Sequence, residues 1–489
     1  MDKKRIIGLQ IIFSYLMLGL QIVTAPILIV LLTKFLTVAE YGVFSLFTAF
    51  VSISFLLLQF GIFQYFLTKI PGKERDDRLN TFLPIIIIHT IFLVIIFSLF
   101  YFSKLSNIFL TFNNLTAYSK EFSLCLVLVV FYTTSKLFDA YFQAKKKINT
   151  ANFIDFVRNK GWIVLIPILI FLNKVTLFNI LLVWGIGIFL ILVFYGTSLL
   201  GELKKVTALK FNFDPIRKAI KFGLPLIATS LFGWIISSSD RYILNYYIDT
   251  ASVGIYNLAY SIVGIIFTVG VAGSIVVMPY FAEEWNKKGD YNWLLNFSLK
   301  YGLCIVLPGI IAISFLREEV ILLISNINYM AAAPIIPILA IFPLFALLNA
   351  IFQQPLLVSD KTKKIAGVYF VGAILNAALN LMLIPKYGIK SAAITTGISY
   401  FAMAVLTIIF TRKLVKIDFG FLRLGRVLGS GIVMGFVIWQ LKIFLNLHLL
   451  VLVGVGGLVY LALLFVTRAV EVEEIKEVLK RKKEDQVVL

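Results

Sequence analysis

Charged side chains interrupt several long apolar runs of this 489-residue chain. Lys136 and Asp139 lie in one run, Asp240 and Arg241 in a second, and Lys300 in a third. A charge at bilayer depth is costly and persists mainly where it faces other protein or a water-filled cavity. The sequence therefore predicts a helical membrane bundle with a polar interior, as in a transporter or a channel.

Two of these runs pair an acid with a base. Lys136 and Asp139 are three residues apart, so a helix places them on one face. We interpret them as a pair that lines a cavity, with Asp139 as a candidate ion or proton site. The alternative is a structural pair whose lysine extends to the membrane interface. Asp240 and Arg241 are consecutive and lie about 100° apart around a helix, so each needs a partner elsewhere.

The chemistry of Arg241 suits a phosphate, because a guanidinium stays charged and donates in a planar fork. Asp240 is a further candidate for ion coupling; the alternative for both is a structural ion pair between helices. Lys300 could add positive charge to an inward-facing cavity, or extend to the interface. The amides of Gln59, Asn257 and Gln353 suit sugar hydroxyls and equally suit hydrogen bonds between helices.

Long apolar spans must position these residues. The chain is 60% hydrophobic and 14% charged, with a mean hydropathy of +0.96, and its runs lack the alternation of a barrel strand. We predict an all-α polytopic membrane protein. About fourteen spans are expected, at 6–32, 42–67, 82–102, 121–143, 153–172, 177–199, 222–248, 252–279, 293–316, 335–358, 365–384, 391–411, 427–446 and 449–467. The first span is too long for a cleavable signal peptide.

The net charge is +20, and the distribution of the basic residues indicates membrane topology rather than a surface that binds nucleic acid. Lys and Arg gather in clusters between spans, such as Lys3 to Arg5, Lys145 to Lys147 and Lys361 to Lys364. Cytoplasmic loops hold such a basic excess. We predict a multi-pass protein of the cell membrane with both termini in the cytoplasm and no nucleic-acid partner.

A weak internal repeat predicts the domain organisation. Gly42–Leu46 resembles Gly254–Leu258, which lies 212 positions later, and an even number of spans separates the copies. Two parallel six-helix lobes with a substrate path between them are expected. The predicted parts are an N-terminal lobe (1–200), a cytoplasmic connector (201–221), a C-terminal lobe (222–411), two appended helices (412–467) and a charged tail (468–489). Prolines at 334, 337, 343 and 355 predict kinks in the tenth span. For Pro334 and Pro337 the alternative is ordinary irregularity at the start of the helix.

Motifs for other functions are missing from the sequence. It has no phosphate-binding loop of the G-x-x-x-x-G-K-[ST] type and no metal-ligand spacing. We therefore expect no catalytic residue, no metal and no cofactor, and a secondary transporter rather than an enzyme.

Three segments resemble a known family. The family is that of the polysaccharide transporters, or lipid-linked oligosaccharide flippases. Its first-loop segment resembles Phe35–Leu46, its helix 7–8 segment resembles Asp240–Leu244 with Val253–Tyr260, and its helix 11–12 segment resembles Asn380–Ala393. This family belongs to the multidrug/oligosaccharidyl-lipid/polysaccharide exporter superfamily. The resemblance implies two six-helix lobes in a V shape, two extra helices, a cationic cavity, coupling to an ion or proton gradient, and transfer of polyprenyl-diphosphate-linked glycans to the outer leaflet.

One departure concerns the first two helices, which lack the buried arginines of lipid II flippases and have Gln21 and Gln59 among their few polar groups. This departure weakens the interpretation as a carrier of peptidoglycan precursors. The resulting hypothesis is a flippase with Arg241, then Lys136 or Lys300, at the diphosphate. Other membrane proteins of glycan assembly are further candidate partners. The alternatives are a drug/cation antiporter of the same fold, a membrane glycan polymerase, and a non-catalytic scaffold.

Overall fold

The computed structural model describes residues 3–72, 74–204, 214–287, 289, 291–416, 421–445 and 447–470. Every regular element among these residues is a helix, which confirms the all-α prediction. The middle of the predicted connector (205–213) and most of the predicted tail (471–489) lie outside the described residues.

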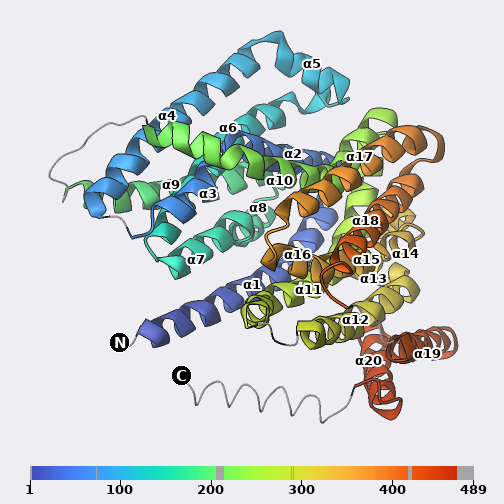
Figure 1. Cartoon of the computed structure of the whole chain (residues 1–489). Coiled ribbons are helices and arrows are strands. Elements are labelled where there is room, and N and C mark those ends of the chain that lie inside the picture. Colours follow the sequence, from blue (N-terminus) through green and yellow to red (C-terminus); the bar gives the residue numbers. More distant parts are fainter. Residues whose placement is uncertain are drawn as a thin grey trace. The chain divides into compact units, whose positions relative to one another are not determined.

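Twenty α-helices and three short 3₁₀ helices follow one another along the described chain (Figure 1). The helices are α1 (Lys3–Phe35), α2 (Val38–Leu58), α3 (Ile62–Lys69), α4 (Arg75–Phe102), α5 (Lys104–Phe112), η1 (Thr116–Tyr118), α6 (Ser119–Ala144), α7 (Ile148–Asn159), η2 (Gly161–Leu165), α8 (Ile166–Phe171), α9 (Leu177–Leu203), α10 (Asp214–Tyr247), α11 (Thr250–Asn286), α12 (Tyr291–Phe315), α13 (Arg317–Ile324), η3 (Ile327–Ala332), α14 (Ile336–Leu339), α15 (Phe342–Phe352), α16 (Gln354–Val358), α17 (Thr362–Tyr387), α18 (Ile389–Thr411), α19 (Phe421–Leu445) and α20 (Leu449–Val466).

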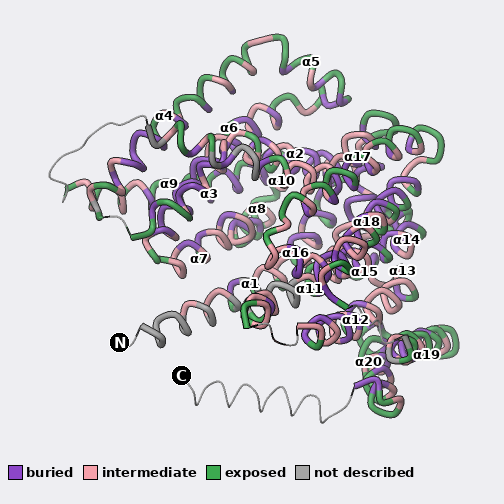
Figure 2. The backbone as a smooth tube through the Cα atoms, viewed as in Figure 1, coloured by how far each residue is buried: buried purple, intermediate pink, exposed green. Residues whose placement is uncertain are grey.

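The lengths and composition of these helices fit a membrane. Among the described residues, eleven helical stretches are long and apolar enough to cross one. Large apolar side chains are exposed on α4, α5, α19 and α20 (Figure 2), for example Phe102 at 84% and Phe444 at 77%. Lipid chains, unlike water, solvate such surfaces without cost. The protein is therefore a polytopic membrane protein, and the number of about fourteen spans remains a prediction.

The predicted fifth span, 153–172, is not one continuous helix. α7 ends at Asn159, the 3₁₀ helix η2 follows, and α8 begins at Ile166 with Pro167 in its first turn. Proline is tolerated there because the first N–H groups of a helix have no partner within the helix. The structure thus divides this predicted span into two helices, and the charged α7 contacts α1 and α6 through its polar side chains.

Two other spans break where the sequence supplies a breaker. The tenth span divides into α14, α15 and α16, each with a proline in its first turn. The predicted breaks at Pro343 and Pro355 are confirmed, whereas Pro334 and Pro337 lie where the span begins. The second span divides into α2 and α3 at Phe60 and Gly61, which have φ values of 48° and 72°. His89 stabilises this break, because its Nε2 lies 2.6 Å from the carbonyl oxygen of Leu58.

The described chain forms two compact units. Unit 1 contains the described residues within 1–258, 324–328 and 373–392, and unit 2 contains those within 259–323, 329–372 and 393–470. The helices α11, α17 and α18 each contribute residues to both units. The two units are sets of residues in mutual contact, whereas the two predicted lobes are copies of a sequence repeat. The lobe boundaries at 200 and 222 therefore remain a prediction.

An aromatic core in unit 1 fixes the helices that carry charge. Phe82 of α4 stacks on Tyr141 of α6 with ring centroids 4.2 Å apart. Phe138 of α6 stacks on Tyr195 of α9 at 5.1 Å and an interplanar angle of 8°. Buried aromatic pairs of this kind contribute beyond their buried area. The core holds α6 and α9 side by side and turns the Tyr195 hydroxyl toward α6.

Candidate functional site

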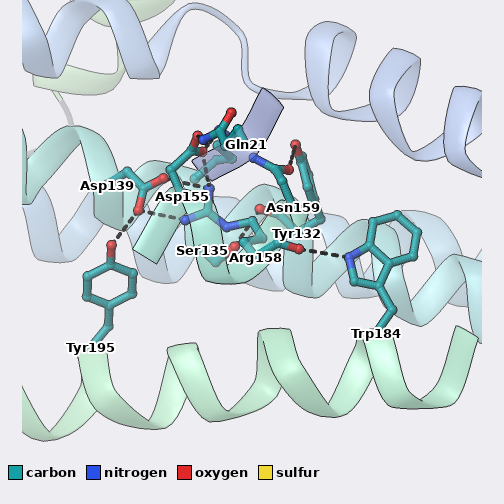
Figure 3. A network of polar contacts seen from close by, with 10 residues as sticks. Gln21, Tyr132, Ser135, Asp139, Asp155, Arg158, Asn159, Trp184 and Tyr195 are labelled. Carbon is teal, nitrogen blue, oxygen red and sulfur yellow. Dashed lines mark hydrogen bonds and ion pairs between the residues drawn. The ribbon is translucent and has the colours of Figure 1, made fainter. Parts of the chain in front are cut away.

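A network of buried charges joins α6, α7 and α9 (Figure 3). At its centre Arg158 of α7 is fully buried and forms a forked ion pair with Asp139 of α6, with Nη1 2.6 Å from Oδ2 and Nη2 2.7 Å from Oδ1. Paired N–H groups matched to both carboxylate oxygens give the strongest and most directional ion pairs. The Tyr195 hydroxyl of α9 also donates to Asp139.

The outer part of the network is less buried. Lys136 of α6 pairs with Asp155 of α7, and the side chains of these residues are 18% and 29% exposed. Nη1 of Arg158 also lies 3.3 Å from Asp155. Lys136 and Asp139 therefore share a face, as predicted, but each pairs with α7. The expected pairing of the two residues with each other is corrected, because α7 offers each of them a charge of opposite sign.

Aromatic rings and a neighbouring helix complete the surroundings of the network. The Tyr132 ring lies 5.8 Å from the Arg158 guanidinium and 5.9 Å from Nζ of Lys136, within the range of cation–π attraction. On the other side of α7, Nε1 of Trp184 donates to the Arg158 carbonyl oxygen at 3.0 Å. These contacts fix the orientation of Arg158 within the membrane part of the protein.

A polar stripe on α1 lies against α7 and its turn. Gln21 donates to Asp155 at 3.4 Å, Ser14 accepts from Asn152 at 2.7 Å, and Gln10 donates to the Lys146 carbonyl oxygen at 3.0 Å. Gln10, Ser14 and Gln21 share one face because they are spaced by four and seven residues. Gln21, one of the few polar groups of the first predicted span, thus contacts a carboxylate.

The electrostatic balance of this network is neutral. Its two cations, Lys136 and Arg158, are matched by Asp139 and Asp155. Arg158 is 0% exposed, so it can act on a ligand only through its neighbours, whereas Lys136 and Asp155 have exposed surface. A phosphate at Lys136 would compete with the carboxylate of Asp155.

Three residues of the network, Arg158, Asp155 and Tyr195, were not predicted as site residues. A signal was present, because Lys136 and Asp139 have the same spacing as Asp155 and Arg158, with the order of charges reversed. Two such pairs predict complementary faces. No comparable signal marks Tyr195, whose role depends on how α9 packs against α6.

Asp240 and Arg241 lie on α10 in a different setting. Asp240 is fully buried, and its Oδ2 accepts from the Tyr256 hydroxyl of α11 at 2.5 Å, while its Oδ1 accepts from the Arg241 backbone N–H at 2.8 Å. Within the described chain, hydrogen bonds rather than an ion pair hold this carboxylate. Arg241 is half-buried. The carboxylate of Asp240 thus differs from that of Asp139, which a guanidinium neutralises.

The remaining candidates are placed individually. Lys300 of α12 is 7% exposed, so protein surrounds it, and its Nζ lies 5.4 Å from the Tyr301 ring centre. Asn257 is buried beside Tyr256 on α11, and Gln59 is buried at the end of α2. Gln353 is half-buried where α15 meets α16. Of the predicted residues, Lys136 and Asp139 share one network, Asp240 and Arg241 share α10, and Lys300 and Gln353 belong to unit 2.

A second polar cluster and a pocket involve the appended helix α19. Lys442 lies 2.8 Å from Glu319 and 3.7 Å from Glu318. A pocket of about 390 Å³ adjoins this cluster, lined by Ser314, Phe315, Arg317, Pro337, Trp439, Lys442 and Ile443. No group of three or more His, Cys, Asp or Glu residues in the described ranges could hold a metal ion.

Comparison with known proteins gives two family matches. The family described as polysaccharide biosynthesis protein matches residues 9–285, which is more than half of the chain. The MatE family matches residues 225–382. The first match covers the charge network and α10, and the second covers Asp240 and most of α11 to α17.

Individual relatives agree with the first match. An uncharacterized membrane protein of Methanocaldococcus jannaschii is 29% identical over 214 residues, covering 43% of this chain and 42% of the relative. A protein named as a probable low-salt glycan biosynthesis flippase, Agl15 of Haloferax volcanii, is 22% identical over 260 residues, covering 52% of this chain and 55% of the relative. The chain thus spans about half the length of the curated relatives it matches.

A solved structure has the same fold over nearly the whole chain. The lipid II flippase MurJ in an inward closed conformation superposes with a TM-score of 0.76, covering 92% of this chain and 98% of that one at 16% identity. At this identity the likeness is evidence for the fold alone.

Proposed function

Because the chain belongs to the polysaccharide biosynthesis protein family, we propose that it is a flippase that moves a lipid-linked glycan between the leaflets of the membrane by alternating access. The substrate we propose is a polyprenyl-diphosphate-linked oligosaccharide, carried from the inner to the outer leaflet of the cell membrane. The naming of a Haloferax volcanii relative as a probable glycan biosynthesis flippase supports the substrate class.

The observation that carries the proposal is the set of ionisable groups built into apolar helices and kept away from lipid. Asp139, Arg158, Asp240 and Lys300 are each less than 9% exposed. A purely structural bundle gains little from such residues, since replacing buried ion pairs by apolar groups is often neutral or stabilising. In membranes, buried ionisable residues typically mark the path of a substrate or an ion.

Arg241 is our first candidate to bind the diphosphate. It is half-buried, so it can reach a ligand, and its planar fork matches two phosphate oxygens. Lys136 is second, since a phosphate there must displace Asp155, and Lys300 is third because it is buried. The amides of Gln59, Asn257 and Gln353 are proposed to bind sugar hydroxyls, while the lipid tail stays in the bilayer.

The test compares Arg241→Ala with two matched variants in a strain that lacks the native gene. Arg241→Ala should abolish surface glycan at an unchanged protein level. Arg241→Lys keeps the charge but loses the fork, so it should retain partial export. Lys442→Ala removes a cation already paired with Glu319 and should export normally. Full export by Arg241→Ala would remove this residue from the mechanism.

Asp240 is the stronger of the two candidates for coupling to an ion or proton. Asp139 is neutralised by Arg158, whereas hydrogen bonds alone hold Asp240 within the described chain. Asp240 can therefore bind and release a cation without leaving a buried guanidinium unpaired. We therefore propose Asp240 as the coupling residue.

The MatE match to residues 225–382 supports a second candidate function, a drug/cation antiporter of the same fold. Such a carrier would use the buried carboxylate of Asp240 to bind organic cations. Growth of an expressing strain on cationic dyes distinguishes the two. Resistance that depends on Asp240 but not on Arg241 would favour the antiporter.

A further inference from the structure

Two glycines form a reciprocal backbone contact between α2 and α11 in unit 1. A Cβ atom on Gly42 would overlap the carbonyl oxygen of Thr250, and a Cβ atom on Gly254 would overlap the carbonyl oxygen of Val38. Backbone atoms cannot move aside as a flexible side chain can. The contact therefore exists only while both positions are glycine.

The repeat found in the sequence relates the two halves of this contact. Gly254 follows Gly42 by 212 positions, and Thr250 follows Val38 by the same number. Each glycine thus touches the carbonyl oxygen four residues before its own repeat partner. Such reciprocity is expected where equivalent helix ends from two repeats meet at their symmetry axis. Val38 and Thr250 are the first residues of α2 and α11, so the contact joins the two helix starts.

A second glycine pair closes the other end of the same span. Gly61, between α2 and α3, and Gly223 of α10 are so close that a Cβ atom on either would overlap the Cα atom of the other. Between the two pairs, α2 is linked to α10 by the Tyr242 hydroxyl, which donates to the Leu46 carbonyl oxygen at 2.8 Å, and by Nε1 of Trp234, which donates to Ser52 at 3.1 Å. The predicted topology puts Gly42 at the outer face and Gly61 at the cytoplasmic face.

We infer that the two glycine contacts are the outer and inner gates of the transporter, Gly42 with Gly254 at the outer face and Gly61 with Gly223 at the cytoplasmic face. A contact between bare backbones has no interdigitated side chains, so it can separate and form again without rotamer changes. Both contacts join a helix of the predicted N-terminal lobe to a helix of the predicted C-terminal lobe. Separating one while keeping the other opens the space between them to one side.

This inference rests on the proposed alternating access, and it makes a prediction about sidedness that needs no substrate. A methyl group at the outer contact disfavours only conformations closed at the outer face, and a methyl group at Gly223 disfavours only those closed at the cytoplasmic face. A ligand or a mutation shifts such an equilibrium by its differential effect on the two states.

The experiment uses a reporter cysteine placed between the gates. Ser52→Cys on α2 is a conservative change at an exposed position, introduced with both native cysteines, Cys125 and Cys304, replaced by Ala. A membrane-impermeant methanethiosulfonate reagent is added to right-side-out or inverted vesicles. Gly42→Ala and Gly254→Ala should each raise the labelling rate about tenfold from the outer face and leave the other rate unchanged.

Gly223→Ala should do the reverse, with faster labelling from the cytoplasmic face only. Gly264→Ala is the matched control, since it lies on α11 with no atom within 4 Å of its added Cβ. Rates equal to this control would overturn the inference. The inference would also be overturned if all variants showed faster labelling from the same face. Faster labelling from both faces, as in a misfolded protein, would overturn it as well. If the outer and cytoplasmic variants label from opposite faces but the protein transports no glycan, the gates are supported and the proposed flippase function is refuted.

Discussion

Removal of the guanidinium of Arg158 is the sharpest test of the charge network. Arg158→Met keeps a long side chain in α7 but deletes the fork that holds both oxygens of Asp139. Asp139 would then remain buried at 2% exposure with the Tyr195 hydroxyl as its remaining donor. A buried carboxylate without a cation is strongly disfavoured.

The expected magnitude follows from the burial of both partners. Breaking a buried ion pair by removing one partner costs about 3–5 kcal/mol, and exposures of 0% and 2% place this pair at the buried extreme. The double variant Asp139→Leu, Arg158→Met removes both charges and leaves only the Tyr195 hydroxyl without its acceptor. That loss costs about 1–2 kcal/mol. The double variant should therefore be more stable than either single variant.

Unfolding in mixed micelles, followed by tryptophan fluorescence, measures these differences. Trp184 is a local reporter because its indole N–H donates to the Arg158 carbonyl oxygen. The matched control is the exposed pair of Lys287 and Glu283, whose side chains are 66% and 55% exposed. Lys287→Met should cost less than about 1 kcal/mol, as is typical of surface pairs.

Two results would refute the reasoning about this pair. If the free energy of unfolding of Arg158→Met lies within about 1 kcal/mol of the wild-type value, then the buried carboxylate of Asp139 does not depend on Arg158 as the geometry implies. If the costs of the single variants add up in the double variant, the two residues are not coupled.

Two further predictions concern other helices. Asp240→Asn keeps the shape of the side chain and an acceptor for Tyr256 but removes the charge. The variant should still fold, but its flipping of lipid-linked glycan in vesicles should no longer depend on an imposed ion or proton gradient. A gradient dependence equal to that of the wild type would exclude Asp240 from coupling. Gly435→Ala in α19 would place a Cβ 2.6 Å from Ile311 and 2.8 Å from Phe315, so it should destabilise the protein by about 1–3 kcal/mol in the same unfolding assay. Gly429→Ala in the same helix meets no atom within 4 Å and should be neutral or stabilising.

Some elements of the structure could be predicted because their cause is local. Proline lacks a backbone N–H, so the breaks at Pro343 and Pro355 follow from the sequence. The shared face of Lys136 and Asp139 follows from helical spacing.

Other features depend on which helix lies beside which. Lys442 lies on α19, and it pairs with Glu318 and Glu319 of α13. Asp155 and Arg158 of α7 complete the charge network through their partners on α6. Spacing along one helix says nothing about the partner across an interface, so these pairings could not be derived from it.

The amino-acid sequence by itself determined that this is an all-helical membrane protein with charges placed inside apolar runs, because hydropathy and helical periodicity are properties of each segment alone. Only the tertiary structure decided that α7 neutralises Lys136 and Asp139, and that Gly42 meets Gly254 across two repeats. The physical reason is that a buried charge or a bare backbone is stabilised by a neighbour distant in sequence, and packing selects that neighbour.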